Sequence, residues 1–267
     1  MIMNKPLQFY KYDGAGNDFV LLDIREYDPE LNVEQIARIC HRRFGIGADG
    51  LMTLSKSQEG YDFEMRYYNS DGRLGSMCGN GGRCITAFAR QLGIGDLRHY
   101  SFMAYDGPHK AEVLMWNQNI GLVQLGMRDV ACSNVRRCLD GWFLDTGSPH
   151  FVVRVDDLEN YDVVGQGRRY RNMLDLFPEG TNVDFVSDLP DGRLFVRTFE
   201  RGVEDETWAC GTGVTASAIV SGNGRIKTLG GDFKVTFTST GEAYSDVRLT
   251  GPVSFNFQGE LPAGFLS

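Results

Sequence analysis

A cysteine followed by a glycine-rich stretch occurs twice in this chain, and the repetition constrains the fold more than any other feature. The first copy, MCGNGG, occupies residues 77–82, and the second, ACGTGV, occupies residues 209–214. The two cysteines, Cys78 and Cys210, lie in opposite halves of the chain, and small and apolar residues follow each one. An internal repeat of this kind indicates a fold assembled from two similar parts.

The sequence upstream of each cysteine supports this interpretation. Gly16, in YDGAGNDFVLLD, precedes Cys78 by almost the same interval as Gly147, in LDTGSPHFVVRV, precedes Cys210. Both segments have the pattern of a strand, a glycine turn and a second strand. We therefore predict two pseudo-equivalent domains that face each other across a tight junction.

The predicted domain limits follow from this alignment. The N-terminal half comprises residues 1–127 and carries Cys78, and the C-terminal half comprises residues 128–251 and carries Cys210. We expect a C-terminal strand at about residues 252–267 to return to the N-terminal half. A chain of 267 residues is long enough for two such domains.

Periodicity along the chain indicates a mixed α/β (α+β) fold with few helices. The predicted strands are FVLLD, FEMRYY, AEVLMW, GLVQL, WFLDTG, HFVVRV, NVDFVS, LFVRTFE, FKVTFT and DVRLTG, many of them bounded by Gly, Asp or Asn. Apolar spacing predicts helices at residues 32–45, with Gly45 as the C-cap, at 82–93 and at 213–222. The second and third of these helices follow the two cysteines directly.

Charge and hydropathy exclude several classes of partner. Twenty-seven basic residues against 35 acidic ones give a formal net charge of −8, and no Lys/Arg cluster is present. Nucleic acid and anionic membranes are therefore poor partners. No apolar run approaches the roughly 20 residues of a membrane span, and the N-terminal residues lack the apolar stretch of a signal peptide. We expect a cytoplasmic protein.

Six cysteines are too few for a disulfide scaffold, and we expect them to be thiols. Their spacing matches no common zinc pattern, so no metal site is predicted. Outside the two repeated motifs, a buried cysteine usually acts as a small core hydrophobe. We expect this of Cys40, Cys84, Cys132 and Cys138.

A cysteine at a helix start has a special environment. The first N–H groups of a helix have no intrahelical acceptor, and the helix dipole is positive there. A thiolate is stabilised at this position, so we expect a lowered pKa for Cys78 and Cys210. The glycines beside each cysteine let an anion approach the backbone closely. Phosphate binding would use the same geometry, although the spacing matches no P-loop and GAGNDF lacks the third glycine of a dinucleotide motif.

Two opposed thiols with one carboxylate between them suit inversion at a carbon. One thiolate removes a proton from one face of the carbon, and the other thiol returns a proton to the opposite face. This reaction is racemisation or epimerisation, and it requires no cofactor. Because an amino-acid α-proton is very weakly acidic, the site must be dry and preorganised. A non-catalytic module that binds a carboxylate or phosphate stays open as an alternative.

Six segments occur together in a characteristic order: GAGNDFVLLD, CHRRFGIGADGLM, YYNSDGRLGSMCGNGGRC, DTGSPHFV, FPEGTNVDFV and ERGVEDETWACGTGV. In order and spacing they resemble the diaminopimelate epimerase family, over residues 8 to about 220. The C-G-x-G motif alone is shared with proline racemases and related isomerases. The asparagines and the E-R-G stretch make the resemblance specific.

The resemblance implies two domains whose strands curl around a central helix, with the site in the cleft. It implies epimerisation of LL-2,6-diaminoheptanedioate to the meso form, in lysine and peptidoglycan precursor synthesis, by a homodimer without a cofactor. Cys78 and Cys210 would be the acid/base pair. The implied supporting and substrate-binding residues are His150 and Glu200 beside the thiols, the backbone at Gly79, Asn80, Gly211 and Thr212, and the contacts Asn17, Asn69, Asn182, Glu200 and Arg201.

Three departures from the family pattern concern side chains near these positions. Ser148 stands where many members have asparagine, and Gly50 stands where some have a side-chain amide. The stretch between Arg201 and Cys210 is one residue longer than the commonest form, which either moves Glu206 and Thr207 or bulges outward. A racemase of proline or hydroxyproline is the nearer alternative, but a substrate with one carboxylate would have no use for Arg201 and three asparagines.

Overall fold

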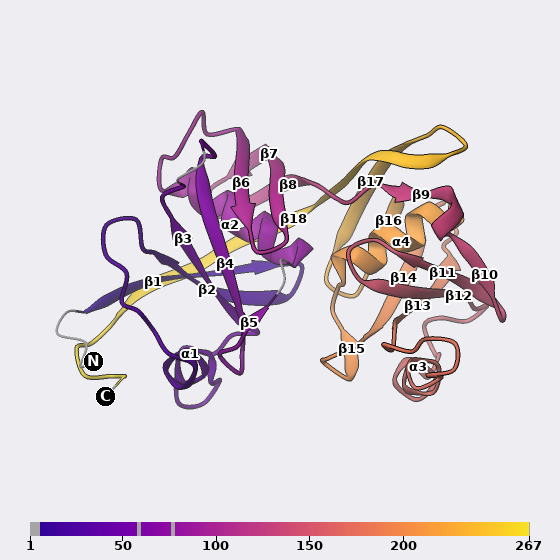
Figure 1. Ribbon diagram of the computed structural model, residues 1–267, viewed down its shortest axis with the longest axis horizontal. Helices are drawn as coiled ribbons and strands as arrows, with labels where there is room; N and C mark the ends of the chain where they lie inside the picture. The colour runs from indigo at the N-terminus through magenta and orange to yellow at the C-terminus, as the bar shows by residue number, and fades with distance from the viewer. Residues whose placement is uncertain (1–5, 58–59, 76–77, 267) are drawn as a thin grey trace. The chain divides into compact units, whose positions relative to one another are not determined.

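A computed structural model describes residues 6–57, 60–75 and 78–266 (Figure 1). Its contacts divide the chain into two units. The N-terminal unit comprises Met1–Leu125 and Pro252–Ser267, and the C-terminal unit comprises Gly126–Gly251. Met77, the first residue of the first repeated motif, lies outside the described residues.

The N-terminal unit alternates strands with two helices. Its elements are β1 (Leu7–Gly14), β2 (Asn17–Asp23), α1 (Val33–Cys40), β3 (Gly50–Ser55), β4 (Phe63–Asn69), β5 (Leu74–Gly75), α2 (Gly79–Gln91), β6 (His99–Ala104), β7 (Gly107–Asn117) and β8 (Ile120–Gly126). Strands β2 and β3 are parallel, as are β4 and β6, whereas β1–β2, β3–β4, β4–β5, β6–β7 and β7–β8 are antiparallel.

The C-terminal unit repeats this order and these pairings. Its elements are β9 (Val130–Ala131), the 3₁₀ turn η1 (Cys132–Asn134), β10 (Arg136–Cys138), β11 (Gly141–Asp145), β12 (Pro149–Arg154), α3 (Val163–Arg171), β13 (Asn182–Asp188), β14 (Leu194–Glu200), β15 (Asp205–Thr207), α4 (Gly211–Ser221), β16 (Arg225–Lys227), β17 (Asp232–Ser239) and the first part of β18 (Ala243–Leu261), whose second part belongs to the N-terminal unit. Strands β12 and β13 are parallel, as are β14 and β16, and the other sequential pairs are antiparallel. The predicted pseudo-symmetric α/β fold is confirmed.

The helix that follows each repeated cysteine is the centre of its unit. Helix α2 contacts β1, β2, β3, β4 and β7, and α4 contacts β11, β12, β13, β14, β16 and β17. Residues 79–89 of α2 and all but one of residues 211–219 of α4 are buried. Such burial on all sides is typical of a helix enclosed by a sheet, and it agrees with strands that curl around a central helix.

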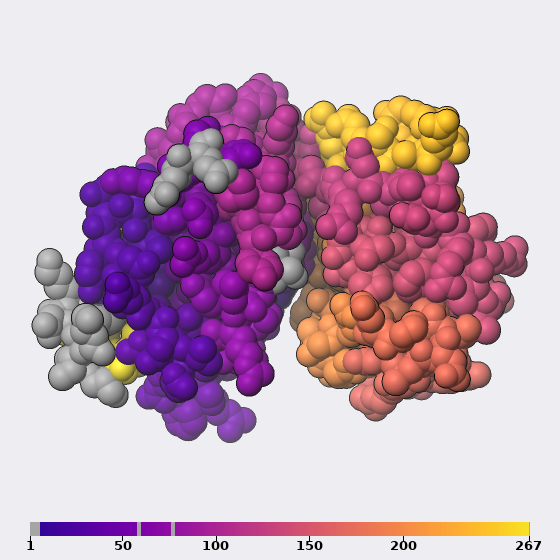
Figure 2. Space-filling view, viewed as in Figure 1, coloured from indigo at the N-terminus to yellow at the C-terminus, as the bar shows by residue number. Residues whose placement is uncertain are grey.

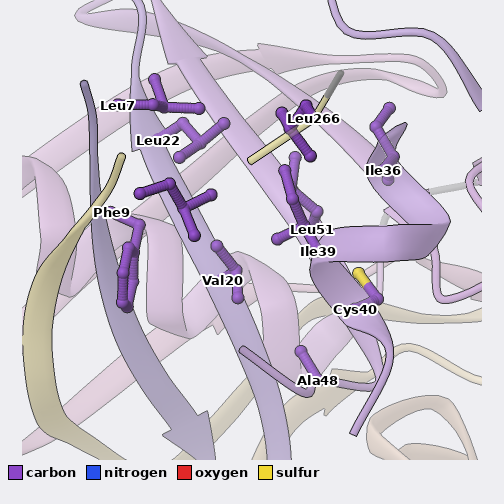
Figure 3. Close-up of a cluster of buried hydrophobic side chains, with 11 residues drawn as sticks. Leu7, Phe9, Val20, Leu22, Ile36, Ile39, Cys40, Ala48, Leu51 and Leu266 are labelled. Atoms are coloured by element: carbon purple, nitrogen blue, oxygen red, sulfur yellow. The ribbon is translucent and has the colours of Figure 1, made fainter. Parts of the chain in front are cut away.

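Strands β2 and β3 are buried on both faces because helix α1 covers their outer side. In β2, the alternation of side chains directs Val20 and Leu22 away from Phe19 and Leu21. Val20 and Leu22 pack with Ile36 and Ile39 of α1 in one hydrophobic cluster (Figure 3). The capping box of Asn32 and Gln35 fixes the start of this helix.

Helix α3 covers the equivalent strands of the C-terminal unit, and no sequence pattern predicted it. Its sequence, VVGQGRRYR, has two glycines and few apolar residues, so its helical pattern is weak. One of those glycines, Gly167, has a packing cause, because a Cβ there would lie 2.3 Å from the Cβ of Phe199 in β14. Because the helix and the strand lie so close together, this position requires glycine, although glycine has a low helix propensity.

The predicted helix at residues 32–45 is too long. Helix α1 ends at Cys40, and His41 adopts an extended backbone conformation. The chain then turns back on the helix, where the backbone N–H groups of Ile46 and Ala48 donate to the carbonyls of Ile39 and Cys40. These bonds satisfy the end of the helix in place of the C-cap expected at Gly45.

The other sequence predictions differ from the structure mainly at element ends. Helices α2 and α4 begin at Gly79 and Gly211, earlier than predicted, because glycine hides the periodic pattern. All ten predicted β-rich runs lie largely within strands, and the strand expected before Gly16 is β1, whereas β3, β5, β6, β9, β10, β15 and β16 were not predicted. The β17–β18 hairpin ends in exposed residues 239–242, part of the yellow surface of the C-terminal unit in Figure 2.

We predict that Gly167→Ala destabilises the protein. The added methyl group clashes with Phe199, and overpacking costs about 1–3 kcal/mol, which outweighs the roughly 1 kcal/mol that alanine gains in helix propensity. Chemical denaturation measures the free energy of unfolding, with Arg168→Ala on the exposed side of α3 as the control. Stability equal to or above that of the wild type would contradict the close packing.

Candidate active site

Each repeated cysteine is the N-cap residue of a central helix, as predicted. Cys78 precedes α2 and Cys210 precedes α4, both with extended backbone conformations. Their carbonyls accept the first helical bonds, from Gly82 N at 2.7 Å and Val214 N at 2.9 Å. Cys210 is buried, with 8% of its surface exposed, and Cys78 is half-buried.

The structure brings Cys78 together with two of the predicted substrate-binding residues. The Cys78 thiol lies 3.7 Å from Oδ1 of Asn17, at the start of β2. The side-chain amide of Asn80, in the first turn of α2, donates to the same oxygen over 3.3 Å. Asn17 therefore presents an acceptor to both groups.

An acidic and basic cluster fixes the orientation of Asn17. The Asn17 amide nitrogen donates to Asp49 over 2.7 Å, and Arg42 holds the other oxygen of Asp49 at 2.6 Å. Arg42 and Lys11 also bind Asp18. Burial alone would raise the pKa of Asp18, but the hydrogen bonds from Arg42 and Lys11 outweigh it and lower the pKa to about 2. Asp49 and Arg42 were missed, although both lie in the quoted segment CHRRFGIGADGLM.

A buried arginine lies one turn into α2. Arg83 is fully buried and donates to the carbonyl of Gly79 over 3.1 Å and to Oδ1 of Asn80 over 2.9 Å. Burial lowers its pKa to about 10, against the opposing effect of Cys84 and Cys78. Because Arg83 holds Asn80 from one side, the Asn80 amide nitrogen is directed towards Asn17. Arg83 was not predicted, although a charged residue inside an otherwise apolar helix is a signal that the sequence contains.

In the C-terminal unit, three predicted residues form a continuous hydrogen-bonded row. The Cys210 thiol lies 3.4 Å from the Thr212 hydroxyl, and this hydroxyl lies 2.9 Å from Nε2 of His150 in β12. Thr146 donates to the Thr212 carbonyl over 2.9 Å, which fixes this first turn of α4. The C-terminal thiol is thus linked to an imidazole through a hydroxyl group.

The row continues beyond His150 into β13. Nδ1 of His150 lies 2.6 Å from Oδ2 of Asp184, and the Thr198 hydroxyl donates to the other oxygen of Asp184 over 2.7 Å. The Asn182 amide lies 3.4 Å from Nε2 of His150 and also donates to the Pro149 carbonyl. Asp184 was not predicted, although alternation within NVDFVS places it on the same face of β13 as Asn182.

Glu200 and Arg201 lie at the end of β14. The Thr207 hydroxyl donates to Glu200 over 3.1 Å, and the backbone N–H of Arg201 donates to Oδ1 of Asn182 over 2.8 Å. The Arg201 guanidinium donates to the Glu179 carbonyl. These bonds join the predicted contacts Glu200, Arg201 and Asn182 at one edge of the unit.

The stretch between Arg201 and Cys210, expected to be one residue longer than usual, turns at an exposed hairpin tip. Residues 202–205 are exposed, whereas Glu206 and Thr207 pair in register with Phe199 and Thr198. Glu206 forms a two-point ion pair with Arg197 over 2.6 Å and 2.7 Å. The β14–β15 pairing therefore holds Glu206 and Thr207 in place next to the exposed tip.

The expected lowering of the Cys210 pKa is wrong. Burial raises the pKa of the thiol well above its usual range, and the charges of Glu200 and Asp184 add to this effect. Hydrogen bonds from Thr212 and the Gly213 backbone oppose it but are weaker. A helix N-terminus favours a thiolate, but here desolvation and two nearby carboxylates dominate.

The remaining predicted positions have ordinary structural surroundings. Asn69 is exposed at the end of β4, and its backbone closes the turn to β5 through bonds with Gly72 and Arg73. Ser148 is half-buried, and its carbonyl accepts from Thr146 N over 3.2 Å. A Cβ on Gly50 would lie 2.5 Å from the Tyr67 ring, so a larger side chain would clash with that ring.

The six cysteines are free thiols. Cys40, Cys84 and Cys138 are buried, as expected of small core residues. Cys132 is only half-buried, in η1 at the surface, so the expectation that it belongs to the core is wrong. Within the described residues, no helix is long and apolar enough to cross a membrane, and no group of three or more His, Cys, Asp or Glu is placed to hold a metal ion.

The chain matches a known protein family through the segments that build this geometry. A sequence model of diaminopimelate epimerase matches two segments, residues 9–130 and 142–255, which together make up most of the chain. The chain belongs to the diaminopimelate epimerase family. The two matched segments carry Cys78 and Cys210, one each.

Curated members of this family resemble the chain over nearly its whole length. Diaminopimelate epimerase from Flavobacterium psychrophilum is 43% identical, over 94% of this chain and 99% of its own length. The enzyme from Chlorobaculum tepidum is 40% identical, over 93% and 98%. The enzyme from Aquifex aeolicus is 36% identical, over 96% and 98%.

More distant solved structures share the fold of this epimerase family member. A phenazine biosynthesis protein of the PhzF family from Bacillus anthracis matches with a TM-score of 0.70 at 13% identity, over 96% of this chain and 99% of its own. A hydroxyproline epimerase from Agrobacterium vitis, with trans-4-hydroxy-L-proline bound, matches with a TM-score of 0.67 at 15% identity, over 99% and 94%. At these identities the likeness shows the fold alone.

We predict that Glu200→Gln makes Cys210 more reactive. Removing the carboxylate charge lowers the raised pKa of the Cys210 thiol, so more thiolate is present at pH 8. Alkylation by iodoacetamide, quantified at Cys210 by peptide mass mapping, should be roughly three- to tenfold faster. Glu204→Gln at the exposed hairpin tip is the control, and an unchanged rate in Glu200→Gln would exclude the electrostatic effect.

Proposed function

We propose that this chain is an isomerase that converts LL-diaminopimelate to meso-diaminopimelate. The observation that carries the proposal is a free cysteine at the N-terminus of each central helix, in a chain of the diaminopimelate epimerase family. Inversion of a carbon needs one group to remove a proton and a second to return one. Cys78 and Cys210 are proposed as these two groups.

The helix starts are proposed to bind the reacting α-carboxylate. Gly79 and Asn80 begin α2, and Gly211 and Thr212 begin α4, so their backbone N–H groups belong to the first turns, where intrahelical acceptors are lacking. Two such ends stabilise the negative charge that develops on the carboxylate and α-carbon as the proton leaves. The same carboxylate position keeps the α-carbon within reach of a thiol.

The two thiols are proposed to start in different protonation states. Cys210 is buried beside Glu200 and Asp184, so in the resting enzyme it is the protonated acid. Cys78 is then the base that takes the first α-proton. After one turnover the roles are exchanged, and a proton must move before the next molecule of the same isomer reacts.

The distal end of diaminopimelate carries an ammonium and a second carboxylate, which require polar partners. Arg201 is proposed to bind the carboxylate, because its planar guanidinium suits that group. Glu200 accepts from the ammonium group, and asparagine can do either. The proposed asparagines are Asn17, Asn69 and Asn182, whereas Ser148 is the doubtful contact.

The proposed reaction proceeds without a cofactor, because both proton transfers are made by side chains of the chain itself. We propose that the enzyme serves lysine and peptidoglycan precursor synthesis, as a cytoplasmic homodimer. Free thiols at both proposed acid/base positions suit a reducing compartment. The negative net charge gives nucleic acid and anionic membranes no role as partners.

We predict α-proton exchange that depends on both thiols. Purified protein is incubated with LL-diaminopimelate in D₂O without added cofactor, beside Cys78→Ala and Cys210→Ala, and followed by NMR. Deuterium at one α-carbon together with formation of the meso isomer is expected, and each variant should lose it.

Two other outcomes would change the proposal. Exchange with proline or hydroxyproline, but not with diaminopimelate, would keep the mechanism and replace the substrate. Folded, reduced protein that exchanges no amino-acid proton would leave a binding module.

A further inference from the structure

A buried pair of ionisable residues lies behind Cys210, and the proposed reaction leaves one of its members without a role. Asp184 and His150 both have 0% of their surface exposed, and their side chains are 2.6 Å apart. The second oxygen of Asp184 accepts from the Thr198 hydroxyl over 2.7 Å. A buried carboxylate is costly unless its oxygens are hydrogen-bonded, and both oxygens of Asp184 have partners here.

The surrounding hydrogen bonds fix which nitrogen of His150 carries the proton. The backbone N–H of Arg201 donates to Oδ1 of Asn182, so the other end of this amide, which faces Nε2 of His150 at 3.4 Å, is the NH₂ group. An amide NH₂ can only donate. Nε2 is therefore the acceptor nitrogen, and Nδ1 carries the hydrogen that it donates to Asp184.

This tautomer connects the imidazole to the thiol. With Nε2 as an acceptor, the Thr212 hydroxyl donates to it over 2.9 Å, and the Thr212 oxygen is free to accept from the Cys210 thiol at 3.4 Å. A Cβ at Gly213 would lie 2.2 Å from Asp184 and 3.1 Å from the His150 ring. The glycine thus lets the carboxylate and the imidazole lie close against the start of α4.

We propose that Asp184 is a positioning residue that holds His150 in the tautomer able to exchange a proton with Cys210 through the Thr212 hydroxyl. The Cys210 S–H proton passes to Oγ1 of Thr212 while the Thr212 hydroxyl proton passes to Nε2 of His150. This leaves a thiolate and an imidazolium, and the Asp184 carboxylate stabilises the imidazolium. The reverse transfer restores the thiol.

The relay rests on the proposed function, in which Cys210 must become a thiolate to act as the base when the meso isomer reacts. For that direction the relay moves the Cys210 proton onto His150, and the reverse transfer returns it. Five groups bear on Cys210 from the surrounding elements: Glu200 of β14, Asp184 of β13, His150 of β12, and both the Thr212 hydroxyl and the Gly213 N–H of α4. Only Asp184 acts on the thiol both as a charge and through His150.

These two actions predict opposite effects of Asp184→Asn. As a charge alone, Asp184 disfavours the thiolate, so its removal would speed alkylation of Cys210 as Glu200→Gln does. As the residue that positions His150, its removal deprives the thiol of its proton acceptor, so alkylation would be slower. An asparagine keeps the size of the side chain and can still accept from Thr198.

The experiment measures the alkylation rate of Cys210 by iodoacetamide between pH 6 and 10, in full-length Asp184→Asn, Glu200→Gln and wild-type protein. Peptide mass mapping reads Cys78 in the same samples as an internal control. We expect Cys210 in Asp184→Asn to react about tenfold more slowly than in the wild type at pH 8, with Cys78 unchanged. A rate equal to or above that of the wild type would overturn the proposal.

A second measurement on the wild-type protein keeps the test decisive if Asp184→Asn does not fold. Long-range ¹H–¹⁵N correlation NMR of His150 should show a protonated Nδ1 and an unprotonated Nε2 at pH 8. A hydrogen on Nε2 would overturn the relay. Neither readout uses diaminopimelate, so failure of the relay and failure of the proposed substrate are distinguishable.

Discussion

Each unit of this chain depends on the start of one buried helix, where the first backbone N–H groups have no acceptor within the helix. A helix that is enclosed on all sides must still satisfy its first turn, and water does not reach it freely. In both units the residue at this point is a cysteine followed by glycine. The start of a buried helix favours an anion, and in both units a thiol lies at this point. The strands, the outer helices and the asparagines are arranged around these two points.

The two helix starts are topologically equivalent but chemically different. Cys78 is half-buried, with Asn17 beside it and the buried guanidinium of Arg83 one turn further along. Cys210 is buried beside Glu200 and Asp184, which raise its pKa. A repeated fold places equivalent backbone in both units, and the side chains give the two thiols different surroundings. In a two-base reaction one group begins as the base and the other as the acid, and these roles are exchanged in the reverse direction.

The sequence predicted the features that depend on local pattern. The repeated cysteine motifs, the strands with apolar alternation and the two central helices were all evident from residue type and spacing. Helix α3 was not, because the close approach of Phe199 selects Gly167 against helix propensity. The raised pKa of Cys210 was also missed, since burial and the distant residues Glu200 and Asp184 override the local helix end.

Among the site residues, the resemblance to a family identified those that belong to motifs, and the fold added those that support them. Asp184 and Asp49 are single carboxylates whose partners, His150 and Asn17, lie in other strands and far away in the sequence. Only the parallel pairing of β12 with β13, and of β2 with β3, brings such residues together. The mutual approach of Cys78 and Cys210 stays a prediction.

A disulfide trap measures most directly whether Cys78 and Cys210 serve one substrate. The protein is oxidised mildly, its epimerase activity is followed before and after addition of reductant, and its cysteine peptides are mapped by mass spectrometry. A Cys78–Cys210 disulfide that forms as activity is lost, and that reductant reverses, is the expected result. Loss of activity that reductant does not restore, without a Cys78–Cys210 peptide, would contradict a shared site for the two thiols.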